Sequence, residues 1–117
     1  MPEGRTFLLV RQRIRWSLPG GTVRTCETPQ ECAQRELGEE TGLAARSLVY
    51  LWQFTGFNKT HYVFLAELEE DVQAQPRNEI RSCRWFAPRD ITTLLLSVPT
   101  RSILRLVPDD SDSVSAE

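Results

Sequence analysis

Residues 21–43 constrain the fold of this chain more than any other segment. Thr28 is a residue type that caps helix N-termini, a proline follows it, and Glu31 stands three positions later, which completes the pattern of a capping box. Gly42 supplies the stop signal typical of a helix C-terminus. We therefore predict a helix over about residues 29–41, preceded by a loop.

Three glutamates of this predicted helix fall on one face. Glu36, Glu39 and Glu40 are spaced i, i+3 and i+4, so they lie within a sector of about 100°. Like charges at this spacing cost roughly 0.2–0.5 kcal/mol per pair, and a hard divalent cation such as Mg²⁺, Mn²⁺ or Ca²⁺ would reverse that cost. Three acids alone also fit a solvated helix face, so the pattern by itself leaves both interpretations open.

Two neighbouring features suit a binding site. Arg35 projects beside Glu39 and can reach an acid outside the helix, for which Glu27 is the natural candidate. The glycines at positions 20 and 21 allow a backbone group to approach a metal ion or a phosphate closely, because no Cβ blocks the way.

The rest of the chain mixes strand signals with helical ones. Runs of apolar, aromatic and β-branched residues predict strands over residues 6–12, 48–55, 61–68 and 79–86. Pro88 begins a segment in which residues 94–96 and 103–107 indicate helical packing, with a break at Pro99. This mixture indicates an α/β or α+β domain.

Length and composition limit the class of protein. The 117 residues suffice for one domain, and 40% hydrophobic with 26% charged residues is ordinary globular composition. The apolar runs are far shorter than the ~20 residues that cross a bilayer, so we expect no membrane segment. The net charge of −2 gives no reason to expect binding to duplex nucleic acid. We expect a single domain over residues 1–108 and an acidic, disordered tail over 109–117.

The cysteines argue against a zinc site. Cys26, Cys32 and Cys83 form no closely spaced pair, and His61 is the one histidine of the chain. The first residues lack the long apolar stretch of a secretory signal. We therefore expect reduced thiols and a cytoplasmic protein.

The full pattern of residues 21–43 is more specific than the three acids. Glycine is followed after five residues by glutamate, after seven more by Arg-Glu, an aliphatic residue, any residue, Glu-Glu, any residue, glycine and an aliphatic residue. This pattern resembles the Nudix box at every specified position, a match with a chance probability on the order of 10⁻⁸. Residues 7–11, 18–21, 79–80 and 85–86 also resemble the family, so the resemblance loosely covers most of residues 5–107.

The resemblance implies a fold and an activity. The Nudix fold is an α/β/α sandwich with a mixed sheet, and most members use Mg²⁺ or Mn²⁺ to hydrolyse a nucleoside diphosphate linked to another moiety. A small nucleotide derivative is then the expected partner, and a pyrophosphate bond is the one cleaved. Charge neutralisation by cations is what such a multiply charged anion requires.

The resemblance also implies roles for individual residues. Glu36 and Glu40 are expected as metal ligands, with the Gly21 carbonyl as a further candidate. Glu39 is expected as a third ligand or as the general base, and Glu79 as another ligand or base. Two further sets are expected, a structural brace of Glu27 with Arg35 and substrate contacts from Arg11, Arg15, Trp16 and Phe57.

The sequence departs from the family at its start. The family usually has a further strand ahead of residues 7–10, and few residues precede them here. Either a neighbouring subunit covers that edge, or the chain is truncated, or the sheet is smaller. Because four consecutive apolar residues suit a strand covered on both sides, we expect a homodimer in which a second subunit shields residues 5–12.

The substrate is less determined than the family. No proline lies between Pro29 and Pro76, which departs from the ADP-ribose enzymes, and residues 7–13 do not resemble the coenzyme A motif. Dinucleoside polyphosphate enzymes of the family tend to place a tyrosine downstream of the box, for which Tyr62 is a loose match. A MutT-type nucleoside triphosphate pyrophosphohydrolase remains by elimination. The alternative is a non-catalytic Nudix-like ligand sensor or interaction module, although the usual sign of one is a damaged box.

Overall fold

The computed structural model describes residues 6–56 and 58–107, and its strands form two sheets. In the first, β1 (Phe7–Gln12) lies between β2 (Arg15–Ser17) and β5 (Ser82–Phe86), and the second is the hairpin of β3 (Ser47–Gly56) and β4 (Lys59–Glu67). The helices are α1 (Pro29–Thr41), α2 (Pro88–Ile91) and α3 (Val98–Leu106). All pairings between these strands are antiparallel, so the parallel part of the expected mixed sheet is reduced, within the described residues, to one bridge between Trp16 and Leu96.

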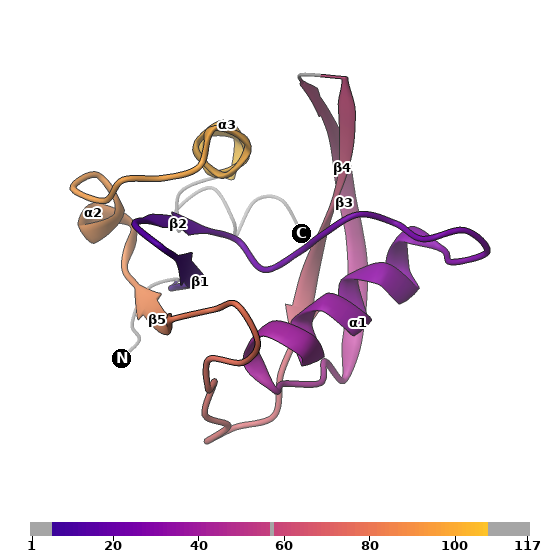
Figure 1. The fold of residues 1–117 in the computed structure, drawn as a ribbon, viewed down its shortest axis with the longest axis horizontal. Helices are drawn as coiled ribbons and strands as arrows, with labels where there is room; N and C mark the ends of the chain where they lie inside the picture. Colours follow the sequence, from indigo (N-terminus) through magenta and orange to yellow (C-terminus); the bar gives the residue numbers. More distant parts are fainter. Residues whose placement is uncertain (1–5, 57, 108–117) are drawn as a thin grey trace, which may run out of the picture.

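Helices cover the three-stranded sheet on both faces. Leu9 of β1 is fully buried and packs with Trp16 and Ile91, whereas the adjacent Leu8 packs with Leu37 of α1. Successive side chains of a strand point to opposite faces, so β1 contributes to two cores at once. Figure 1 shows α2 and α3 gathered beside β1 and β2, with α1 alongside the β3–β4 hairpin. The α/β/α arrangement expected from the sequence is confirmed.

The β3–β4 hairpin is long and regular except at one point. Its register runs from Ser47 opposite Glu67 to Gly56 opposite Lys59, and it shifts between Tyr50 and Trp52. Leu51, the residue between them, is the extra residue of a β-bulge, which bends β3 relative to β4 at this point. On β4, Tyr62 and Phe64 are two positions apart and therefore share one face.

Two predicted elements differ from the observed ones. The last strand begins at Ser82, not at residue 79, and residues 94–96 are not helical. Instead, the Trp16 N–H donates to the Leu95 carbonyl at 2.9 Å, and the Ser97 N–H donates to the Trp16 carbonyl at 2.9 Å. These two hydrogen bonds hold residues 95–97 against β2, where the Trp16 side chain is buried. Pro99 does not break a helix, because it lies in the first turn of α3, where proline is tolerated.

The dimer expected at residues 5–12 stays a prediction. β1 pairs with β5 along Phe7 to Arg11 and, on its other side, with β2 along Val10 to Gln12, so the chain itself covers one side of this strand and part of the other. Leu8, Leu9 and Val10 are buried by the chain's own sheet and helices. An apolar strand is therefore explained in part within one chain, and light scattering is the measurement that tests the dimer.

Two further expectations concern the ends of the chain and the membrane. The predicted acidic tail over residues 109–117 lies outside the described residues. Among residues 6–56 and 58–107, none of the helices is long and apolar enough to pass through a bilayer.

Candidate metal and nucleotide site

Helix α1 begins and ends where local chemistry fixes it. The Thr28 side chain accepts a hydrogen bond from the Glu31 N–H at 3.0 Å, and the Glu31 carboxylate accepts one from the Thr28 N–H at 2.9 Å. At the other end Gly42 adopts the left-handed φ of 78° and donates its N–H to the Gly38 carbonyl. The predicted bounds of the helix are confirmed, and they fix the angular positions of the three glutamates.

Arg35 joins the loop to the helix. Its Nε lies 2.7 Å from Glu27 Oε2 and its Nη2 lies 3.0 Å from Glu27 Oε1, which is a bidentate pair. Hydrogen bonds from the Arg35 side chain and from the Arg24 N–H lower the pKa of Glu27 to about 2. The Arg35 Nη1 also donates to Glu36 at 3.1 Å and to Glu39 at 3.2 Å. One guanidinium thus neutralises part of a crowded acidic surface.

Glu40 is the buried member of the three glutamates. Among the described residues it is the one charged residue that is buried, and its Oε1 accepts a hydrogen bond from the Gly20 N–H at 3.2 Å. Burial raises the pKa of Glu40 to about 7, and the charges of Glu36 and Glu79 act in the same direction. A carboxylate held in this way gains from a cation placed beside it.

Gly21 leaves room for the Glu36 carboxylate. A Cβ built on Gly21 would overlap that carboxylate, whereas a Cβ on Gly20 would meet nothing within 4 Å. The Gly21 carbonyl also accepts a weak hydrogen bond from the Cys32 thiol, with the Sγ 3.7 Å away. The glycine required by the box is therefore explained by close approach of a carboxylate, and its carbonyl oxygen keeps a second lone pair free for another contact.

Glu79 comes from a distant loop and joins these residues. It lines one open hollow together with residues of the box and the loop before it, namely Thr22, Val23, Arg24, Thr25, Arg35, Glu36 and Glu39. We use the term carboxylate cluster for Glu36, Glu39, Glu40 and Glu79. Glu79 is far from the other three acids along the chain, so their meeting is a tertiary result.

The carboxylate cluster fits a hard divalent cation by its chemistry. Its donors are oxygens, the space for one of them depends on the absent Cβ of Gly21, and burial together with like charges raises the pKa of Glu40. In the described part of the chain no three acidic, histidine or cysteine side chains already converge on a single point. Glu36 and Glu39 each form an ion pair with Arg35 instead. A cation would have to compete with Arg35 for these oxygens.

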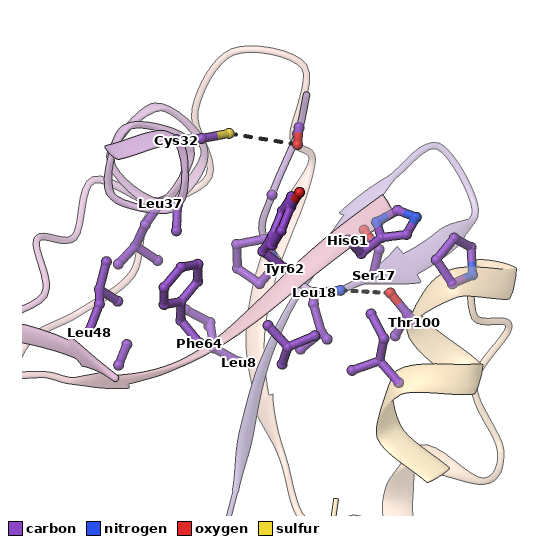
Figure 2. Close-up of a pocket in the computed structure, with 18 of the residues that line it drawn as sticks. Leu8, Ser17, Leu18, Cys32, Leu37, Leu48, His61, Tyr62, Phe64 and Thr100 are labelled. Carbon is purple, nitrogen blue, oxygen red and sulfur yellow. Dashed lines mark hydrogen bonds between the residues drawn. The ribbon is translucent and has the colours of Figure 1, made fainter. Parts of the chain in front are cut away.

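A separate cavity of about 430 Å³ adjoins this surface. Its volume lies within the usual range of small-molecule sites. Figure 2 shows Tyr62 and Phe64 of β4 in this cavity, with Leu37 and Leu48 near Phe64. Gly20 and Gly21 also line it, and these same residues contact Glu40 and Glu36. The two glycines therefore separate the carboxylate cluster from the cavity.

The expected substrate contacts are placed elsewhere. Trp16 is buried in the core against Phe86, with ring centroids 5.0 Å apart, and Arg11 lies over the Trp16 ring and donates to Ser82 Oγ at 3.1 Å. Arg15 is exposed on β2. These three residues line neither hollow described above. The expectation for Phe57 lies outside the described residues.

Sequence reasoning missed residues that only the fold brings to the site. The side chain of Arg24 reaches within 3.9 Å of Glu39, and the side-chain amide of Asn78 donates to the Glu39 carbonyl at 2.8 Å. Tyr62, which the sequence offered only as a loose match to one substrate class, lines the cavity from β4. An asparagine immediately before Glu79 was the one local signal, because asparagine often marks a turn.

Comparison with known proteins gives the family of this chain. The family model described as the NUDIX domain matches residues 1–107, and the chain therefore belongs to the Nudix family. A candidate 8-oxo-dGTP diphosphatase 3 of Mycobacterium tuberculosis is 32% identical over 81% of this chain and 51% of its own length. Phosphatase NudJ of Escherichia coli K12 is 35% identical over 76% of this chain and 64% of its own. The chain thus spans between half and two thirds of these curated relatives.

A solved structure gives the same result for the fold. The crystal structure of a candidate Nudix hydrolase from Chromobacterium violaceum is 34% identical, with a TM-score of 0.75 over 90% of this chain and 68% of that one.

Proposed function

We propose that this chain is a divalent-metal-dependent hydrolase that cleaves a pyrophosphate bond in a nucleoside diphosphate derivative. The observation that carries the proposal is the carboxylate cluster beside the Gly20–Gly21 wall, with a cavity on the far side of that wall. A hydrolase of this kind needs charge neutralisation at the phosphates and a recess for the nucleoside. The carboxylate cluster can hold the cations that neutralise the phosphates, and the cavity beside it is the recess.

Glu36 and Glu40 are proposed to hold the metal ion, with the Gly21 carbonyl as a further oxygen. Nudix proteins generally use divalent cations, and Mg²⁺ or Mn²⁺ suits this all-oxygen donor set. When bound, the ion supplies charge neutralisation at the pyrophosphate and lowers the pKa of a bound water.

The remaining acidic residues are proposed to handle the proton. Glu39 lies at the exposed rim of the hollow, where its carboxylate can accept a proton from an attacking water, and Glu79 lines the same hollow. Arg35 and Glu27 keep the loop against α1 and so fix the position of Gly21. Arg35 also restrains the Glu36 and Glu39 carboxylates before a cation arrives.

The cavity is proposed to receive the nucleoside. Its walls are mostly apolar, and Tyr62 offers an aromatic ring on which a base can stack. A nucleoside triphosphate of the MutT type is the substrate class we favour, and the name of the relative from Mycobacterium tuberculosis, which refers to 8-oxo-dGTP, supports testing oxidised nucleotides. We propose that a single domain, residues 1–108, carries out this reaction and that it does so inside the cell.

Phosphate release over a nucleotide panel with Mg²⁺ or Mn²⁺ tests the proposal. The panel contains canonical and oxidised nucleoside triphosphates, dinucleoside polyphosphates and nucleoside diphosphate sugars. Glu36→Gln and Glu40→Gln are each expected to lower kcat/KM by roughly 100-fold or more, because each removes a ligand charge and keeps the side-chain shape. Glu70→Gln, at an exposed acid that lines neither hollow, serves as the control. Metal-dependent turnover on no member of the panel would favour the sensor alternative.

A further inference from the structure

The loop of residues 75–80 closes over the C-terminal end of α1. The last four carbonyls of a helix have no partner within it, and those of α1 belong to residues 38–41. Gly42 serves the first of them with its N–H. The loop serves the remaining three through the Gln75 N–H to Thr41 at 2.9 Å, the Arg77 N–H to Glu40 at 3.2 Å, and the Asn78 side-chain amide to Glu39 at 2.8 Å.

The same loop has a fixed internal shape. The Ile80 N–H donates to the Arg77 carbonyl at 3.0 Å, which closes a turn around Asn78 and Glu79. Asn78 adopts a left-handed φ of 56°, a conformation that asparagine tolerates better than most residues. Ile80 is 7% exposed. Glu79 is therefore held between a residue bonded to α1 and a residue buried in the core.

Arg77 adds a charge at the same helix end. A Cβ built on Gly42 would lie 2.9 Å from the Arg77 Cζ, so the guanidinium covers the glycine that ends the helix. The last turn of α1 holds no basic residue of its own. A cation here interacts favourably with the helix dipole, and the loop gains a second attachment to the box.

We infer that Asn78 is a positioning residue, which holds Glu79 in the carboxylate cluster by donating its side-chain amide to the Glu39 carbonyl. This inference rests on the proposed function, since it gives Glu79 a part in the metal site. This hydrogen bond links α1 to the loop that carries Glu79, and Glu39 of α1 and Glu79 of the loop line the same hollow. Without it, the loop keeps the Gln75 and Arg77 bonds to α1 but loses the one made by the residue adjacent to Glu79.

The substitution Asn78→Gly removes the amide and keeps the backbone conformation, because glycine adopts a positive φ freely. Asn58→Gly is the matched control, since Asn58 has a φ of 64° and lies exposed at the β3–β4 turn. Binding of Mn²⁺ is measured from the electron paramagnetic resonance signal of the free ion, in the absence of nucleotide. We expect Asn78→Gly to weaken Mn²⁺ binding by about 10-fold, as loss of an outer-shell partner does, and Asn58→Gly to leave it unchanged.

The double variant separates positioning from a general structural effect. If Asn78 acts through Glu79, Asn78→Gly weakens Mn²⁺ binding no further in a Glu79→Gln background. Asn78→Ala also removes the amide but is strained at the positive φ of residue 78, so it is expected to weaken Mn²⁺ binding at least as much as Asn78→Gly. Thermal unfolding verifies that both variants stay folded. Wild-type Mn²⁺ binding in Asn78→Gly, or an equal loss with and without Glu79, overturns the inference.

Failure of the proposed function gives a different result. In that case the wild type hydrolyses no member of the panel, or Glu36→Gln and Glu40→Gln bind Mn²⁺ and hydrolyse the substrate as the wild type does. When these two variants lose binding and Asn78→Gly does not, only the role of Asn78 is refuted.

Discussion

At the scale of single residues, Glu27 and Arg35 give the loop its pH dependence. The folded pKa of Glu27, about 2, is below its ordinary value of 4.5, so its ion pair stabilises the fold fully above about pH 4.5. That contribution is lost as the pH falls from about 4.5 through about 2. We expect Glu27→Gln to lower the free energy of unfolding at pH 7 and to remove this part of the acid dependence, as measured by urea unfolding between pH 2 and pH 7.

The partner of Glu27 supplies the control for that prediction. Arg35→Ala leaves Glu27 without its bidentate donor, so the two variants remove one interaction. We expect the loss in the double variant to be smaller than the sum of the single losses. Fully additive losses would show that the two residues act independently.

Glu40 has the opposite sign of pH dependence. Its folded pKa of about 7 exceeds 4.5, so in the metal-free protein its contribution to stability is present below about pH 4.5 and is lost as the pH rises through about 7. We expect metal-free Glu40→Gln to be more stable than the wild type by roughly 2 kcal/mol at pH 8, with the difference vanishing near pH 4. Urea unfolding in the presence of a chelator measures this, and a variant less stable than the wild type at pH 8 would contradict it.

At the scale of elements, strand β4 supplies aromatic side chains to the cavity. Tyr62 and Phe64 line it, whereas Leu65 does not and is exposed. Stacking of a base on an aromatic side chain is worth about 1–3 kcal/mol. We expect Tyr62→Ala to raise KM for the best nucleotide by about tenfold with little change in kcat. Leu65→Ala is the control in steady-state kinetics, and equal KM values for both variants would place the base elsewhere.

At the scale of the whole molecule, β1 unites the domain. Its alternating side chains belong to the core under α1 and to the core under α2 and α3, which makes the described residues one packing unit. Residues 109–117 are polar and acidic in sequence. We expect deletion of residues 109–117 to leave the unfolding midpoint and kcat/KM unchanged, as measured by thermal unfolding and phosphate release. A lower midpoint would show that the domain extends beyond residue 108.

The sequence by itself determined the features that depend on near neighbours. The bounds of α1 follow from a capping box at Thr28 and a left-handed Gly42, and both are interactions within a few residues. The shared face of Glu36, Glu39 and Glu40 follows from the helical period alone. The Nudix box of residues 21–43 is a pattern of residue types at fixed spacing, so the family is recognisable from the order of the amino acids.

Only the tertiary structure decided what depends on contacts between distant residues. It placed β1 inside a sheet and Trp16 in the core, buried Glu40, and brought Glu79 to the box. Sequence patterns report whether a residue is apolar or charged, but burial and long-range pairing depend on which segments pack together. For that reason an apolar strand suggested a partner subunit, whereas β5 of the same chain pairs along Phe7 to Arg11 and β2 along Val10 to Gln12.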